Sequence, residues 1–442
     1  KKVYVLVIDS KPFSLNNYGE TLEDLMALNF IMKGENSDFN YTDIMKSQGK
    51  IYYTISEETY NKINKLNNLK GIYTFVSDKI DTKQAWAVNS IFSNITDKNI
   101  VKGSVQEEIY ENIKNNEIPK KNFYLDEKNV YKDEELVVNE DNKNIRLTID
   151  KDFDKKIREV LKNEEYQKYK NVGVSIIESN TGKIKALVQK NESEANINLG
   201  IEGIGYEPGS IYKLITYGAA LEEGLITSYS TVSCNGKMCN GKAHGTLTIN
   251  EGLIKSCNDV FGAVGRKVGY ESLMGYSEKL GLFNKVIGIE GIGKNETSGI
   301  KPKNTDSDNN NLMALISIGQ SMNVSPIQML GAINTFVNDG IYVKPYIIEG
   351  ILDNDDKVVK EYETKKERIF TQTTSKIVKN GMKEVVLNGT GVNAFVQGVD
   401  IRKKTGSSSS SNNTTHGWFV GYFTIDNIEY TVLYDKNDKE LY

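Results

Sequence analysis

Ser210 and Lys213, which lie three positions apart, are the residues whose types and spacing first suggest chemistry. Pro208 and Gly209 precede an apolar pattern at helical spacing, so we expect Ser210 in the first turn of a helix. On a helix the two side chains share one face. A lysine can take the proton of a serine hydroxyl once burial or another cation lowers its pKa. Taken alone, such a pair more often marks a capped helix with a solvated lysine.

Two further short motifs follow in the chain, Ser256-Cys257-Asn258 and Lys404-Thr405-Gly406. Each is weak evidence by itself. The second lies directly before two apolar, aromatic-rich runs, residues 417–422 and 428–434, which favour adjacent antiparallel strands. We therefore expect residues 404–406 on an edge strand beside them. The three motifs in this order are typical of acyl-serine enzymes that react with penicillin.

The region that carries these motifs resembles the transpeptidase domain of class B penicillin-binding proteins. Four more segments resemble that family: residues 145–150 (IRLTID), 319–328 (GQSMNVSPIQ), 388–391 (NGTG) and 416–422 (HGWFVGY). The resemblance implies an α+β fold, the penicillin-recognising serine transferase fold, with helices flanking an antiparallel five-stranded sheet and an all-helical subdomain. It also implies an N-terminal mixed α/β pedestal domain, although residues 1–140 carry a much thinner resemblance.

The resemblance implies a catalytic role for each residue of the first two motifs. Ser210 would attack the carbonyl of a peptide that ends in D-alanyl-D-alanine, forming an acyl-enzyme and releasing D-alanine. Lys213 would accept the proton of that serine, and Ser256 would pass a proton to the leaving amine. Asn258 would hold the amide of the substrate and keep Lys213 in place.

The third motif would bind the substrate. Lys404 would favour the neutral state of Lys213 and attract the carboxylate of the substrate, to which Thr405 would donate a hydrogen bond. Gly406 has no Cβ, so the substrate could approach the edge of the sheet closely. The backbone N–H groups of Ser407 and Ser210 would stabilise the oxyanion.

Three cysteines and one of the two histidines gather around the second motif: Cys234, Cys239, His244 and Cys257. Thiolate and imidazole are preferred zinc ligands, so a structural zinc site at the rim of the active site is one interpretation, in keeping with a zinc-binding, sporulation-type family member. Cys257 would then face away from the substrate. A disulfide between Cys234 and Cys239, a buried thiol at Cys257 and a turn at His244 are the alternatives. We expect His416 to be structural.

The elements that must position these residues fall into two predicted domains, residues 1–140 and 145–442, joined by a polar linker within residues 132–144. In the first domain, apolar patterns predict strands at residues 3–8 and 51–55 and helices at 20–32 and 107–114. In the second, they predict a helix over residues 152–169 and a hairpin of residues 172–179 with 184–188.

Composition excludes several classes of function. The chain has 442 residues and a formal net charge of -4, and its lysines form no basic stripe, so nucleic acid is not an expected partner. No apolar run approaches the roughly 18 residues of a membrane span. A membrane anchor, expected for an extracytoplasmic enzyme of this kind, would therefore lie outside this chain.

The function we expect is that of a peptidoglycan D,D-transpeptidase, which cross-links stem peptides and is acylated by β-lactams, beside a cell-wall glycosyltransferase. Acylation needs no cofactor. One alternative is a β-lactam sensor or a β-lactamase-type hydrolase, since these use the same acyl-serine chemistry. Another is a scaffold of a cell-wall complex, with residues 1–140 as its docking surface.

Overall fold

The computed structural model describes most of the chain, namely residues 2–9, 18–42, 49–66, 71–79, 82–93, 95–127, 131–200, 204–291, 295–304, 310–389, 402–409 and 415–438. Two compact units are present. The first comprises Lys1–Asp81 and Asn115–Asn142, and the second Thr82–Lys114 and Lys143–Tyr442. Residues 82–114 thus group with the second unit, whereas the sequence-based division into 1–140 and 145–442 stays a prediction about domains.

A three-stranded antiparallel sheet with the order β2-β1-β3 forms the core of the first unit. Its strands are β1 (Lys2–Asp9), β2 (Lys50–Ile55) and β3 (Ile72–Asp78), and its helices are α1 (Tyr18–Glu35) and α3 (Glu57–Ile63). Alternation along β1 turns Leu6 and Ile8 toward Leu25 and Leu28 of α1, and all four are buried. The predicted strands at 3–8 and 51–55 and the helix at 20–32 are confirmed.

The polar segment that we expected to be a linker is a strand. β5 (Tyr131–Val137) pairs with β4 (Lys120–Leu125) in an antiparallel hairpin. Charged and polar side chains stabilise this hairpin instead of an apolar face. Lys121 forms an ion pair of 2.6 Å with Glu134, and the Tyr124 hydroxyl donates to Glu135. A linker is therefore the wrong prediction for residues 132–137, whereas the boundary between the two units, between Asn142 and Lys143, lies within the predicted range 132–144.

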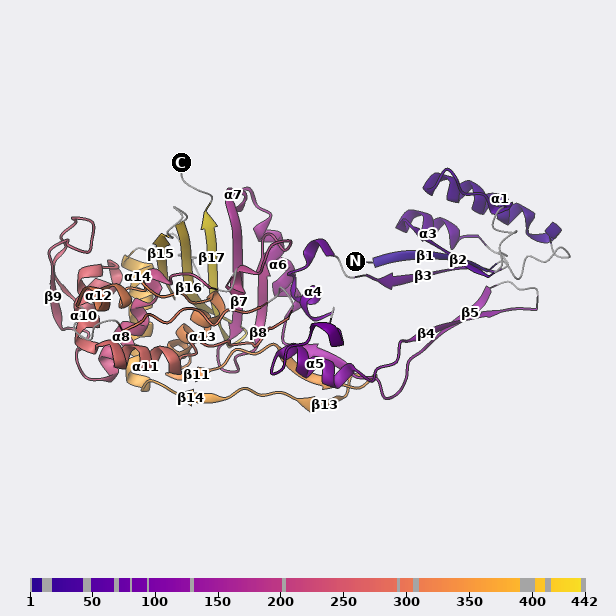
Figure 1. Cartoon of the computed structure of the whole chain (residues 1–442). Coiled ribbons are helices and arrows are strands. Elements are labelled where there is room, and N and C mark those ends of the chain that lie inside the picture. Colours follow the sequence, from indigo (N-terminus) through magenta and orange to yellow (C-terminus); the bar gives the residue numbers. More distant parts are fainter. Residues whose placement is uncertain are drawn as a thin grey trace. The chain divides into compact units, whose positions relative to one another are not determined.

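A five-stranded antiparallel sheet with the order β15-β16-β17-β7-β8 is the centre of the second unit (Figure 1). The strands are β7 (Tyr169–Glu178), β8 (Ile184–Gln189), β15 (Arg402–Ser409), β16 (Thr415–Ile425) and β17 (Ile428–Asp438). The predicted hairpin, the paired aromatic strands and the edge position of residues 404–406 are confirmed. The sheet and its helices show the predicted α+β fold.

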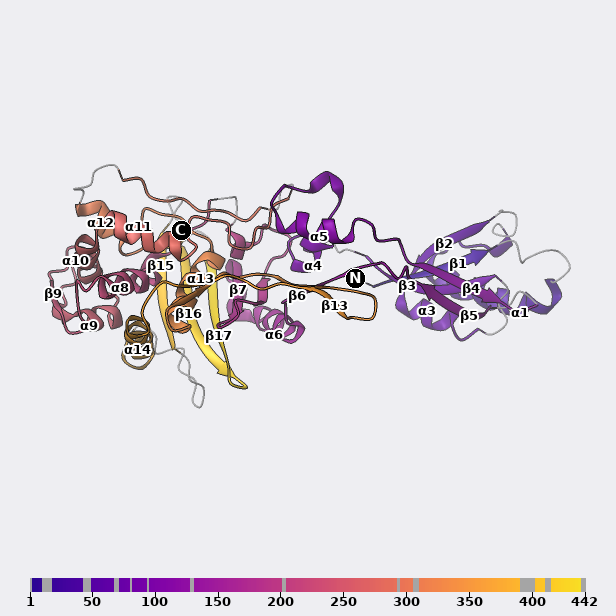
Figure 2. The same ribbon diagram turned by 90° about the horizontal axis from the view of Figure 1, so that it is seen from below.

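Helices cover both faces of this sheet. α6 (Lys151–Leu161) packs on one face, where Phe153 contacts Phe423 and Tyr430. α13 (Pro326–Val337) lies on the other face, against β7 and β17. Figure 2 shows further helices gathered on this second side; they are α8 (Lys213–Glu222), α9 (Ile249–Ile254), α10 (Asn258–Val268), α11 (Tyr270–Lys279), α12 (Asn310–Ile316) and α14 (Gln372–Asn388).

The helix predicted over residues 152–169 is shorter than expected. α6 ends at Leu161, a short helix α7 (Glu164–Gln167) follows, and β7 begins at Tyr169. The ammonium of Lys190 donates to the carbonyls of Tyr166, Gln167 and Tyr169, which closes the helical segment there. The prediction was wrong at its C-terminal end because Lys190 is remote in sequence.

Shorter elements complete the second unit. They are α4 (Val88–Phe92), α5 (Val105–Ile113), β6 (Asn144–Leu147), β9 (Thr231–Cys234), β10 (Gly245–Thr248), β11 (Ile341–Val343), β12 (Ile348–Leu352), β13 (Val358–Glu361), β14 (Lys366–Arg368) and four 3₁₀ turns at Thr82–Gln84, Asp97–Asn99, Ile197–Leu199 and Gly209–Ile211. α5 confirms the helix predicted at 107–114. Within the described ranges we find no helix with the length and apolar character of a membrane span.

Candidate active site

Ser210 lies in a 3₁₀ turn, Gly209–Ile211, that leads directly into α8, whose first residue is Lys213. In a 3₁₀ turn, side chains three residues apart eclipse, which brings serine and lysine together. Two glycines let the turn fit beneath a neighbouring loop: Gly209 donates to the carbonyl of Gly319 at 2.9 Å, and a Cβ on Gly319 would lie 2.2 Å from the Gly209 carbonyl oxygen. The expected position of Ser210 at a helix start is therefore observed.

Lys213 is fully buried and its amine is surrounded by oxygen atoms. Its Nζ donates to the Ser210 hydroxyl at 3.0 Å, the Ser256 carbonyl at 2.7 Å and Oδ1 of Asn258 at 2.6 Å. Burial lowers the pKa of Lys213 to about 7, although the thiols of Cys257 and Cys239 oppose the shift. A large fraction of this amine is therefore neutral near neutral pH and can accept the serine proton.

Ser256 links two amines. Its Oγ lies 3.2 Å from Nζ of Lys213 and 3.0 Å from Nζ of Lys404. Its φ of 53° is in the left-handed region that few residues other than glycine adopt, and such backbone strain is concentrated at functional sites. Lys404 is also fully buried. Burial is the main cause that holds its pKa well below the ordinary value, and the charge of Lys213 is the second cause.

Asn258 is held in a single orientation. Oδ1 accepts from Lys213, while Nδ2 donates to the carbonyl of Met238 at 2.9 Å. A flipped amide would set two acceptors against each other, so the assignment of oxygen and nitrogen follows from the two partners. Residues of the first two motifs and Lys404 thus form one hydrogen-bonded cluster around two buried amines. We call Ser210, Lys213, Ser256, Asn258 and Lys404 the acyl cluster.

The rest of the third motif lies on the edge strand β15. Gly406 faces the Ser210 turn, since a Cβ there would lie 3.0 Å from the nitrogen of Ile211 and from the carbonyl oxygen of Pro208. The space that a side chain would need is thus filled by the protein itself. Thr405 is partly exposed, and alternation turns its side chain to the opposite face. Ser407 pairs with Gly417 of β16, and its side chain is outside the described part.

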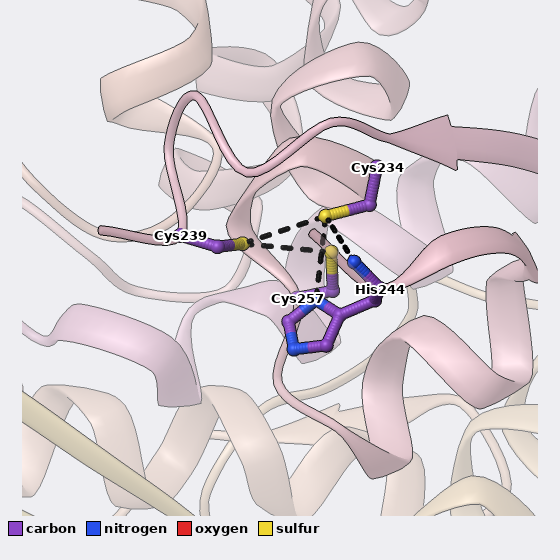
Figure 3. Close-up of side chains that lie close together, drawn as sticks. All are labelled: Cys234, Cys239, His244 and Cys257. Atoms are coloured by element: carbon purple, nitrogen blue, oxygen red, sulfur yellow. Dashed lines mark hydrogen bonds between the residues drawn. The ribbon is translucent and has the colours of Figure 1, made fainter. Parts of the chain in front are cut away.

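The four residues of the cysteine-histidine cluster converge (Figure 3). Their ligand atoms all lie within 4.8 Å of one another. Sγ of Cys234 lies 3.9 Å from Sγ of Cys239 and 3.3 Å from Nδ1 of His244, and Sγ of Cys239 lies 3.7 Å from Sγ of Cys257. Tetrahedral zinc with bonds of about 2.3 Å to sulfur separates two sulfurs by about 3.8 Å, so the set fits one metal ion.

The disulfide alternative is wrong for this structure. All three cysteines are free, and their sulfurs are far beyond the about 2.05 Å of a disulfide bond. Cys257 is fully buried and forms the N-cap of α10, and burial raises the pKa of its thiol to about 12. A bound cation would reverse that shift by favouring the thiolate.

Asp259 supports this cluster, and the sequence analysis missed it. Its carboxylate accepts from Sγ of Cys234 at 3.1 Å and from the backbone nitrogens of Gly236 and Met238, each at 2.8 Å. Burial acts to raise the pKa of Asp259, but these hydrogen bonds outweigh it and the net shift is downward. An acidic residue directly after Asn258, in the first turn of a helix, was the available signal.

Comparison with known proteins gives a consistent family. A model described as the penicillin binding protein transpeptidase domain matches residues 172–440. Stage V sporulation protein D of Bacillus subtilis is 32% identical over 216 residues, which is 46% of this chain and 33% of that protein. The peptidoglycan D,D-transpeptidase FtsI homolog of Mesostigma viride is 27% identical over 266 residues, 52% of this chain and 44% of that protein. The chain thus spans between a third and a half of these curated relatives.

Solved structures share the fold. Penicillin binding protein 3 of Mycobacterium tuberculosis in complex with aztreonam has a TM-score of 0.58 at 22% identity, covering 67% of this chain and 73% of that one. A peptidoglycan synthetase of Bifidobacterium adolescentis has a TM-score of 0.63 at 15% identity, covering 100% of this chain and 88% of that one. At these identities the likeness shows the fold alone.

Proposed function

The chain belongs to the penicillin-binding protein transpeptidase family, and from that premise we propose that it is a serine D,D-transpeptidase that cross-links peptidoglycan stem peptides and is acylated by β-lactams. The observation that carries the proposal is the buried amine of Lys213 at 3.0 Å from the Ser210 hydroxyl, with a pKa lowered to about 7. This pairing supplies both the nucleophile and its base.

The first half-reaction forms an ester. Lys213 takes the proton of Ser210 while the serine oxygen attacks the carbonyl of the penultimate D-alanine of a stem peptide. The oxyanion of the tetrahedral intermediate accepts hydrogen bonds from the backbone N–H groups of Ser210 and Ser407, a device worth about 3 kcal/mol per donor in related enzymes. Ser256, which contacts the Lys213 amine, passes a proton to the leaving nitrogen, and D-alanine departs as the peptide bond breaks.

The second half-reaction transfers the acyl group. An amine of a neighbouring stem peptide attacks the ester, the proton of the amine returns through Lys213, and the Ser210 hydroxyl is restored. Lys404 lies 3.0 Å from the Ser256 hydroxyl, and the charge of Lys213 helps to lower the pKa of Lys404, so the two amines are not readily charged together; a bound substrate carboxylate would favour the charged form of Lys404. Asn258 keeps the Lys213 amine directed at Ser210. The substrate-binding roles expected for Thr405 and Gly406 stay predictions, since Gly406 faces the Ser210 turn.

Cys234, Cys239, His244 and Cys257 are proposed to hold a zinc ion. Four protein ligands saturate a tetrahedral site, so such an ion would stabilise the fold and would not activate water. The loop that carries Cys239 also presents the Met238 carbonyl, which orients Asn258. The proposed zinc site would therefore act on the acyl cluster through the position of this loop. The zinc would thereby stiffen one wall of the acyl cluster.

The names of two relatives refer to sporulation and to a peptidoglycan D,D-transpeptidase. We accordingly propose that this chain works on the outer side of a membrane, tethered by an anchor outside these 442 residues, and beside a glycosyltransferase that supplies glycan strands.

Intact mass spectrometry with benzylpenicillin tests the proposal. We expect one penicilloyl adduct per chain, stable for many minutes, and none in Ser210→Ala, whereas Ser272→Ala on the surface of α11 should label normally. Incubation with a donor pentapeptide and an acceptor amine should yield a cross-linked dimer and free D-alanine. Rapid loss of the adduct would instead indicate a hydrolase, a stable adduct without transfer would indicate a sensor, and no adduct at all would leave a scaffold.

A further inference from the structure

A buried histidine and a buried aspartate lie behind the acyl cluster and take no part in the proposed reaction. His416 is the second residue of β16, opposite Ser408 of β15, and Asp435 lies on β17 opposite Trp418. Directly opposed residues point to one face of a sheet, and so do residues two apart. His416, Trp418 and Asp435 therefore share the face on which Gly406 meets the Ser210 turn.

The two side chains form a closed pair. His416 is 5% exposed and Asp435 is fully buried. Nε2 of His416 lies 3.3 Å from Oδ2 of Asp435, an ion-pair distance with poor hydrogen-bond geometry, and among the described residues neither this nitrogen nor either carboxylate oxygen of Asp435 has a hydrogen-bond partner. Burial raises the pKa of Asp435, and the nearby imidazole opposes this. Buried polar groups are rarely left with so few partners, so the pair calls for an explanation.

Gly173 makes room for the aspartate. A Cβ at this position of β7 would lie 2.5 Å from Oδ1 of Asp435 and 2.6 Å from Oδ1 of Asn198. The amide of Asn198 already donates to the Val188 carbonyl and to Asn196, so its orientation is fixed. The strands are therefore shaped around the carboxylate of Asp435, which sets where the imidazole of His416 can lie.

The imidazole in turn meets the segment that leads to the nucleophile. The ring of Tyr206 stacks on His416 with centroids 3.9 Å apart and planes 11° apart. Trp418 packs edge-on against both rings and donates from Nε1 to the carbonyl of Glu207 at 2.9 Å. Tyr206 and Glu207 precede Ser210 by four and three residues. On its other side, Tyr206 exchanges two backbone hydrogen bonds of 2.9 Å with Val324.

We propose that His416, held by Asp435, is a positioning residue for acyl transfer: through Tyr206 and Trp418 it sets where Ser210 lies relative to the Lys404–Gly406 strand. The effect on catalysis rests on the proposed function. The positioning of Tyr206 and Trp418 by His416 rests only on the contacts between these side chains. A displacement of the nucleophile by a fraction of an ångström is enough to lower the rate of an attack that depends on alignment.

Two single variants and one double variant of His416 and Asp435 distinguish a positioning role from a role in packing alone. His416→Phe keeps a ring for Tyr206 but leaves Asp435 without its partner. Asp435→Asn keeps the shape of the side chain but removes its charge. The double variant His416→Phe/Asp435→Leu replaces the pair by apolar groups, a change that often restores or improves stability. Tyr430→Leu, on the opposite face of the same sheet, is the matched control.

The kinetic measurement is acylation by benzylpenicillin, split into the dissociation constant of the initial complex and the rate constant of ester formation. We expect about a tenfold fall in that rate constant for His416→Phe and Asp435→Asn, normalised to folded protein, with little change in the dissociation constant. The double variant should recover its melting temperature but not its rate. Recovery of both, or unchanged rates in the two single variants, would overturn the proposal.

A second measurement does not depend on acylation. The chain has two tryptophans, so Trp86→Phe assigns the indole N–H signal of Trp418 in an NMR spectrum. We expect hydrogen exchange at this indole to accelerate at least tenfold in His416→Phe and to stay unchanged in Tyr430→Leu. An unaccelerated indole would refute the coupling. Failure of the wild-type protein to form a penicilloyl adduct would instead refute the proposed function, with the indole result still deciding the inference.

Discussion

The acyl cluster and the cysteine-histidine cluster meet at one three-residue segment, residues 256–258, but handle charge in opposite ways. Ser256 and Asn258 contact the amine of Lys213, while Cys257 between them turns to the other thiols. In the described part of the chain, neither Lys213 nor Lys404 has a carboxylate within ion-pair distance. The nearby carboxylate of Asp259 supports the cysteine loop instead.

This partition explains how two sites can share one turn. A buried amine surrounded by uncharged oxygens loses its proton readily, which suits a base. A set of thiols backed by a carboxylate favours a bound cation. Had Asp259 faced the amines, it would have stabilised their charged forms and removed the base. The direction in which each side chain of this turn points therefore decides which chemistry the neighbouring site can perform.

Replacement of the proposed base, Lys213, should have the largest effect on the acyl cluster. Lys213→Met removes the amine but keeps an unbranched apolar chain in the buried space. We expect the rate of acylation by benzylpenicillin to fall by about 10²- to 10⁴-fold, the usual contribution of a general base. Stopped-flow or quenched mass measurements give the rate, and Lys279→Met at the end of α11 is the control. Acylation at an ordinary rate would show that the amine is not the base.

The pH dependence sharpens the same point. With a pKa of about 7, Lys213 is about one-tenth neutral at pH 6 and about nine-tenths neutral at pH 8, so the acylation rate should rise about tenfold between these values and level off above. The sign follows from the lowered pKa, because the base form is lost as pH falls through it. A flat profile, or a midpoint near the ordinary lysine value of about 10.4, would contradict the uncharged surroundings described above.

The cysteine side is tested by metal content. Cys239→Ser should abolish a stoichiometric zinc ion measured by elemental analysis and lower the free energy of unfolding by several kcal/mol, since metal binding free energy is folding free energy. Acylation should fall less than in Lys213→Met, because Asn258 keeps its backbone position in α10. Ser233→Ala on β9 is the control. A wild-type protein free of metal, with a melting temperature that this variant does not change, would refute the site.

The smallest expected effect concerns the edge strand. Gly406→Ala places a Cβ 3.0 Å from the nitrogen of Ile211 and the carbonyl oxygen of Pro208, so we expect a loss of about 1–3 kcal/mol in unfolding free energy and a few-fold slower acylation. Gly275→Ala in α11 meets no atom within 4 Å and should be neutral or stabilising. Equal behaviour of the two variants in chemical denaturation would show that β15 has room to shift.

Sequence alone predicted what depends on short spacing. Ser210 and Lys213 are three residues apart, and the cysteines and His244 lie within one short stretch, so local geometry was enough to bring each group together. The resemblance to the family supplied the link to Lys404, and the catalytic roles of these residues stay predictions. Long-range contacts were beyond reach: Lys190 ends the α7 segment, and Asp435 reaches His416 only because β16 and β17 pair in one register.

The left-handed backbone of Ser256 has a consequence for any effort to make this protein more robust. Glycine would adopt φ = 53° without the penalty of about 1 kcal/mol or more that a side chain incurs, so a search guided by thermal tolerance alone would favour Ser256→Gly. That replacement would delete the hydroxyl shared by the two amines. At this position glycine would therefore favour thermal stability, whereas serine would favour catalytic turnover.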